Sequence, residues 1–100
     1  MIKLIEKKPY TAPTVIERDV RNTSELEKEL NTHFTQLSIG SDLYLLSEVS
    51  EEYEALNIVL DDKAISGTVY VVRGTPSKIT SITDDDMMHF KAVARFIEFN

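Results

Sequence analysis

Two stretches near the N-terminus show the alternation of apolar and polar positions that is typical of strands. They are "IKLIEKK", residues 2–8, and "TVIERDV", residues 14–20. Pro9 and Pro13 lie between them, and a proline has no backbone N–H to donate to a strand ladder. The pattern therefore predicts an N-terminal hairpin whose first strand ends before Pro9.

The period changes in "NTSELEKELNTHF", residues 22–34. Leu26, Leu30 and Phe34 recur every four residues, which places them on one face of a helix. The start of this helix fits a capping box in two registers: Ser24 with Glu27, or Asn22 with Glu25. We predict a helix that packs through its leucine face.

The middle of the chain is predicted to form the sheet. "TQLSIGSDLYLLSEV", residues 35–49, predicts one or two strands broken at "GSD". "YEALNIVL", 53–60, and "GTVYVVRG", 67–74, are the most hydrophobic runs. The acidic "DDK" at 61–63 predicts that these two runs are adjacent antiparallel strands at the centre of the sheet. A polar connection, "TPSKITSIT" at 75–83, follows them.

The last segment begins with three consecutive aspartates, Asp84 to Asp86, in "SITDDDMMHF". If Thr83 is the N-cap, its hydroxyl accepts the backbone N–H of Asp86, and the three carboxylates lie where the helix dipole favours negative charge. Consecutive helical aspartates cannot all converge on one cation. The run is therefore interpreted as a helix start.

Beyond this start, the apolar positions Met87, Phe90, Ala94 and Ile97 fall at helical spacing and favour a helix to the end of the chain. The alternative is that "VARFIEF", residues 93–99, finishes as an edge strand. Together the segments predict one domain, residues 1–100, of the α+β class: a small mixed or antiparallel sheet of about five strands with two helices.

Composition narrows the function. Seventeen acidic and eleven basic residues give a net charge of −6, which disfavours general binding to nucleic acid or anionic lipid. There is no cysteine, so thiolate chemistry is excluded. No signal peptide or apolar run of membrane length is recognisable, and we expect a cytoplasmic protein with no membrane contact. A core this small also allows a homodimer.

Catalytic signatures are missing from the sequence. His33 and His89 are the only histidines, and neither stands in a metalloprotease motif. No serine stands in Gly-x-Ser-x-Gly, and the three glycines are too far apart to form a phosphate-binding loop. The sequence therefore predicts a protein that is not an enzyme and holds no cofactor.

Four residues are candidates for a binding surface. Arg73 ends a hydrophobic strand, from which its planar fork can reach a carboxylate or phosphate at the sheet edge. Tyr44, Tyr53 and Tyr70 could supply amphipathic contact area nearby. A separate, metal-dependent alternative needs Asp61 and Asp62 to meet Asp84 and Asp85 around a divalent cation.

Several segments resemble a family of short uncharacterised proteins carried by phages and mobile elements. The resemblance covers most of the chain and rests on four stretches: "MIKLIEKKPYTAPTVIERDV", "NTSELEKEL", "LNIVLDDKAISGTVYVVRG" and "ITSITDDDMMHF". The matching residues are Ser66, Gly67 and Thr68, then Ser81, Ile82, Thr83, Asp84 and Asp85. The resemblance implies an accessory protein of a phage or integrated element that binds a host component.

Three functions follow as hypotheses. The first is a small non-catalytic binding protein that acts on a host protein in counter-defence or host takeover. The second is an oligomeric sponge that holds a nucleotide-like small molecule with Arg73 and the tyrosines. The third is the metal-dependent enzyme built on the aspartates.

Overall fold

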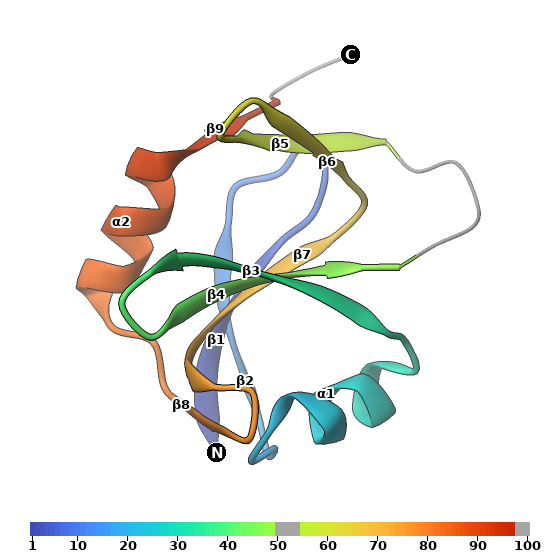
Figure 1. Cartoon of the computed structure of the whole chain (residues 1–100), viewed down its shortest axis with the longest axis vertical. Coiled ribbons are helices and arrows are strands. Elements are labelled where there is room, and N and C mark those ends of the chain that lie inside the picture. Colours follow the sequence, from blue (N-terminus) through green and yellow to red (C-terminus); the bar gives the residue numbers. More distant parts are fainter. Residues whose placement is uncertain (50–54, 98–100) are drawn as a thin grey trace.

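The computed structural model describes residues 1–49 and 55–97, which form two sheets and two helices (Figure 1). The larger sheet has the order β2-β1-β7-β4-β3, with β8 also paired to β7. Its strands are β1 (Ile2–Lys7), β2 (Thr14–Arg18), β3 (Phe34–Gly40), β4 (Leu43–Glu48), β7 (Val69–Thr75) and β8 (Lys78–Thr80). The smaller sheet, β6-β5-β9, contains β5 (Leu56–Leu60), β6 (Lys63–Ser66) and β9 (Ala94–Phe96). The helices are α1 (Thr23–Leu30) and α2 (Asp84–Val93). The predicted α+β class is confirmed.

The central strands of the larger sheet are buried on both faces. Successive side chains of β7 point to opposite sides, so Val69 and Val71 enter one hydrophobic cluster while Tyr70 and Val72 enter another. The first cluster also contains Ile58 of β5 and Phe90 of α2. This two-sided burial explains why β7 is an almost continuous apolar run.

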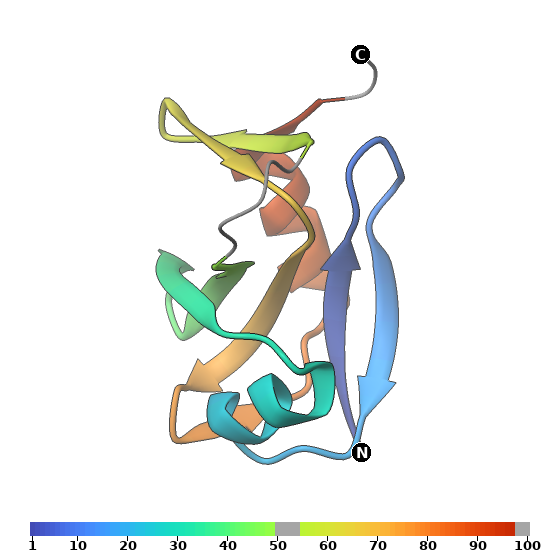
Figure 2. The ribbon, with the colours of Figure 1, turned by 90° about the vertical axis from the view of Figure 1, so that its right-hand side faces the viewer.

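A different layer covers each face of the larger sheet. Leu26 of α1 packs into the cluster on one face, whereas α2 and the smaller sheet pack on the other. Figures 1 and 2 show α1 at the end of the molecule opposite to the smaller sheet, with α2 running between the two ends along one side. The turn of the β1–β2 hairpin rises toward the smaller sheet (Figure 2).

The N-terminal half matches most of the prediction. β1 and β2 form the expected antiparallel hairpin, and the N-cap of α1 is Asn22, whose side chain accepts the backbone N–H of Glu25 at 2.8 Å. Phe34 was wrongly placed on the helix. Asn31 adopts the left-handed conformation that ends many helices, with φ of 53°, and Phe34 then opens β3.

The prediction that the 61–63 turn joins β5 to β7 was wrong. Asp61 and Asp62 both have positive φ, 48° and 65°, which is the geometry of a tight hairpin turn. The chain therefore folds straight back into β6, with Leu60 opposite Lys63. The strands β5 and β7 belong to different sheets. The short and largely exposed β6 carries no apolar pattern that could have revealed it.

The C-terminal part needs two further corrections. The predicted polar connection contains β8, which pairs with β7 and buries Ile79. The last helix ends at Val93, because Ala94 is already extended and begins β9. β9 pairs with β5, so the edge-strand alternative holds for Ala94–Phe96.

Candidate functional site

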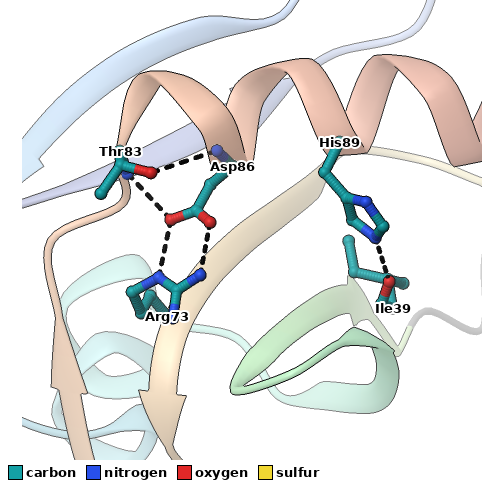
Figure 3. Close-up of polar contacts among 5 residues, drawn as sticks. All are labelled: Ile39, Arg73, Thr83, Asp86 and His89. Atoms are coloured by element: carbon teal, nitrogen blue, oxygen red, sulfur yellow. Dashed lines mark hydrogen bonds and ion pairs between the residues drawn. The ribbon is translucent and has the colours of Figure 1, made fainter.

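Arg73 is bound to a carboxylate of its own chain. Its Nε and Nη2 donate to the two oxygens of Asp86 at 2.8 and 2.5 Å (Figure 3). The same Asp86 oxygen that meets Nε accepts the backbone N–H of Thr83 at 2.8 Å, and Thr83 in turn accepts the Asp86 N–H at 3.2 Å. The predicted N-cap is confirmed, and its capping box also anchors the strand.

In this cluster, which we call the Arg73–Asp86 tie, the charges of the arginine and the aspartate balance each other. The Asp86 side chain is 5% exposed and that of Arg73 34%. The hydrogen bonds from Arg73 lower the pKa of Asp86 to about 2, burial opposes them, and the Thr83 N–H adds to the lowering. A bidentate pair of this kind occupies two of the five N–H donors of the arginine and balances its charge. The tie therefore fastens β7 to the start of α2 and gives Arg73 a counter-charge from its own chain.

A shallow cavity of about 320 Å³ lies beside the tie, between α2 and the β3–β4 turn. One of its walls is His89, whose Nε2 lies 2.6 Å from the carbonyl oxygen of Ile39 (Figure 3). His33 stands at the other end of β3, with Nδ1 4.0 Å from Glu27. A seven-residue strand spans roughly 20 Å, so the two histidines do not form a site together.

The structure separates Arg73 from the predicted tyrosines. Arg73 points to the α2 face of the larger sheet, whereas Tyr44 and Tyr70 belong to the cluster on the α1 face. Tyr70 is buried against Phe34, with ring centroids 5.6 Å apart. Burial first, and then the charges of nearby acids, raises the pKa of Tyr70 to about 12. Tyr53 lies outside the described residues.

The aspartates of the metal hypothesis also lie apart. Leu60, next to Asp61 and Asp62, pairs with Ala94 at the C-terminal end of α2, while Asp84 and Asp85 occupy its first turn. A ten-residue helix is about 15 Å long. Across residues 1–49 and 55–97, no group of three or more acidic or histidine side chains is arranged to hold a metal ion.

Sequence reasoning missed the most unusual polar group of the structure, the ammonium of Lys7. Lys7 ends β1 and is 1% exposed. Its Nζ donates to Asn57 Oδ1 at 2.7 Å and to the carbonyl oxygen of Lys8 at 2.8 Å. The fully buried Asn57 donates back to the carbonyls of Lys7 and Gly67, at 2.7 and 2.8 Å. This network joins the larger sheet to β5 of the smaller one.

The contacts of Lys7 are neutral. Neither of its two acceptors carries a charge, and none of the four ion pairs found among the described residues includes it. The Lys8 carbonyl also accepts from the N–H and hydroxyl of Thr11, so three donors share an oxygen with two lone pairs. Nζ lies 5.2 Å from the centre of the Phe96 ring. Burial lowers the pKa of Lys7.

Lys7 also lines a cavity of about 360 Å³, which we call the Lys7 cavity. Its walls come from the β1–β2 turn, the end of α2 and β9: Lys7, Tyr10, Thr11, Ala12, Pro13, Lys91, Phe96 and Ile97. Two lysines and no acidic residue stand among these residues, although the whole chain carries a charge of −6. The arrangement is suited to a negatively charged guest with an apolar body.

One signal in the sequence could have pointed to this network. Ile5 and Lys7 are two residues apart in a strand, so they share a face, and Ile5 lies in the core. Asn57 likewise interrupts the apolar run of β5. Two polar residues at core-facing positions of different strands suggest a buried polar pair, but the partner of each depends on a fold that the sequence alone did not specify.

Comparison with known proteins adds no relative. No protein-family model matches the chain, and neither the curated proteins nor the solved structures show significant similarity to it. The resemblance to phage and mobile-element proteins therefore stays a prediction. Neither helix in the described part of the chain has the length and apolar character needed to span a membrane.

Proposed function

We propose that this chain is a small non-catalytic binding protein and that the Lys7 cavity takes a small organic anion. The observation that carries the proposal is a buried ammonium whose acceptors within residues 1–49 and 55–97 are all neutral, at the wall of a cavity that contains a second lysine. A buried cation without a counter-charge is costly. An anionic ligand would supply that charge.

The cavity suggests which chemical class fits. A carboxylate or phosphate would lie between Lys7 and Lys91, while a ring or short apolar chain would lie against Phe96, Ala12 and Pro13. The volume falls at the lower end of the range for small-molecule sites. The ligand is thus a compact anion with one apolar part, a class that includes simple aromatic acids and nucleotide-like molecules.

The experiment compares an anion with its neutral counterpart. Amide chemical shifts are followed while the protein is titrated with benzoate, benzamide, inorganic phosphate and adenosine monophosphate. We expect benzoate or a phosphate compound to shift the backbone amides of residues 7, 8, 10–12, 91, 96 and 97, and benzamide to shift none of them. Equal shifts with benzoate and benzamide would refute the anion site.

Two variants assign the binding to the lysines. Lys7→Met should abolish the shifts, and Lys91→Met, a change of an exposed residue, should weaken binding by about tenfold, which is the loss of one partly screened charge contact. Lys63→Met removes an exposed lysine that does not line the cavity and is the matched control. Unchanged affinity in both cavity variants would contradict the proposal.

The biological setting is a separate part of the proposal. An accessory protein of a phage or mobile element would use the cavity to sequester or sense a host metabolite. This setting is supported by the resemblance of the sequence segments, and the test is whether the protein expressed in a host cell retains a small anion during gentle purification.

A further inference from the structure

The edges of the two sheets differ in how well they are protected. β2 carries Glu17 and Arg18 and is preceded by Pro13, and the remaining outer strands β6, β8 and β9 have only three or four residues each. β3 is different, because its seven residues, "FTQLSIG", include no charged residue and no proline. Charges, prolines and short length are the usual devices that keep an edge strand from pairing. Of the described edges, β3 alone lacks all three.

The hydrogen-bond pattern shows which groups of β3 face outward. Val49 donates its N–H to the carbonyl of His33, and these residues extend the β3–β4 register by one position beyond the Phe34–Glu48 pair. Hydrogen-bonded pairs alternate along an antiparallel ladder. Thr35 and Leu37 therefore bond to β4, while the backbone groups of Gln36 and Ser38 point away from it.

One outward group is already occupied. Phe34, which has the same orientation as Gln36, donates its N–H to the Glu27 side chain at 2.9 Å. At the other end, the carbonyl of Ile39 is held by His89. Between these two contacts, no described strand pairs with the outer edge of β3, and the side chains of Gln36 and Ser38 are exposed.

We propose that a second copy of this chain pairs with β3 in antiparallel orientation, which is an inference independent of the Lys7 cavity. In the best register Gln36 of one copy faces Ser38 of the other. Such a pair exchanges two backbone hydrogen bonds. The two-fold axis relates this pair to a second, identical pair. The axis passes between the two Leu37 residues. Shifting the partner strand by two residues brings Phe34 opposite Ser38. The Phe34 N–H already donates to Glu27, so it cannot bond to the second copy in that register.

The side chains at this junction suit a self-pairing edge. Leu37 is partly buried against the cluster beneath α2, and two Leu37 side chains meeting at the axis would bury the remainder. On the opposite face Gln36 and Ser38 can hydrogen-bond without any like-charge contact. Each copy still carries a net charge of −6, so the dimer should tighten as salt screens the long-range repulsion.

The test combines mass with amide exchange. Sedimentation over a range of concentrations should show a monomer that becomes a dimer, at lower concentration in higher salt. At high concentration, hydrogen exchange should be slowed at the amides of Gln36 and Ser38, whereas Thr35 and Leu37 should be protected in both monomer and dimer. A monomer at every concentration, or a dimer in which Gln36 and Ser38 exchange freely, would overturn the proposal.

A pair of variants separates the edge from general surface effects. Gln36→Lys places a charge at the centre of the junction and should shift dimerisation to at least tenfold higher concentration. Val15→Lys puts the same side chain on the β2 edge, at a residue that is 47% exposed, and should leave dimerisation unchanged. A dimer that survives Gln36→Lys with unaltered affinity would also refute the β3 junction.

Discussion

The Arg73–Asp86 tie and the Lys7 cavity each place a cation on the same face of the larger sheet. The two cations differ in their partners, because Arg73 contacts a carboxylate and Lys7 contacts neutral acceptors. Arg73 fastens β7 to α2 through a carboxylate that is itself held by a capping box. Lys7 fastens β1 to β5 through the Asn57 amide, and its other acceptor is the carbonyl of the adjacent Lys8, so both acceptors are neutral. A cation that has found its counter-charge is structural, whereas one that has neutral partners and a cavity can still bind an anion.

The largest expected effect comes from breaking the tie. Asp86→Ala should lower the free energy of unfolding by about 3 kcal/mol, because it removes the N-terminal cap contact and leaves Arg73 without its carboxylate. Asp85→Ala in the same turn removes an exposed carboxylate and should cost less than about 1 kcal/mol. Denaturant unfolding at neutral pH measures both, and equal losses would show that Asp86 contributes only through the helix dipole.

Acid should weaken the same contact. The pKa of Asp86 is lowered from 3.8 to about 2 in the folded protein, so the folded state binds fewer protons than the unfolded state within that range. The stability that Asp86 contributes, about 2 kcal/mol by linkage, is present above pH 4 and lost as the pH falls toward 2. Comparison of unfolding curves for the native protein and Asp86→Asn should show a difference that shrinks across this interval.

Removing the other cation should have a much smaller effect. Lys7→Met removes a buried charge that has no ion-pair partner in the described part of the chain, but it leaves Asn57 Oδ1 without its donor, and these effects oppose each other. We expect a change of about 1 kcal/mol or less in the free energy of unfolding at pH 7. A loss as large as that of Asp86→Ala would mean that the Lys7 network is a structural lock like the tie.

The contribution of Lys7 to stability should also depend on pH, and the burial of Lys7 predicts whether that contribution rises or falls. Burial lowers the pKa of Lys7 below 10.5, so the folded state releases this proton at lower pH than the unfolded state. Stability should therefore rise relative to Lys7→Met as the pH increases through the lowered pKa toward 10.5. Tyr70, whose pKa is raised, makes stability fall as the pH rises. Subtracting the stability curve of Lys7→Met from that of the native protein removes this contribution.

Local patterns predicted those parts of the fold that short-range chemistry determines. Thr83 was placed correctly as an N-cap because a hydroxyl before an acidic first turn has one common use. The split into two sheets was not predicted, because the turn at Asp61 and Asp62 looks the same whether the next strand is β6 or β7. Pairing partners depend on long-range packing, which periodicity does not encode.

The candidate site shows the same limit. Arg73 was expected to reach a carboxylate or phosphate, and it reaches Asp86, thirteen residues later in its own chain. Lys7 was passed over because a lysine at the end of a strand is normally solvated. Its burial results from β5 and β9 packing over β1, an arrangement that no local pattern specifies.

The most direct test of the account is the pKa of Lys7, followed through its side-chain NMR signals with and without saturating benzoate. A carboxylate held beside Nζ stabilises the ammonium, so we predict that benzoate raises the pKa of Lys7 and that benzamide leaves it unchanged. A pKa that does not respond to benzoate or to phosphate would contradict the claim that the Lys7 cavity is an anion site.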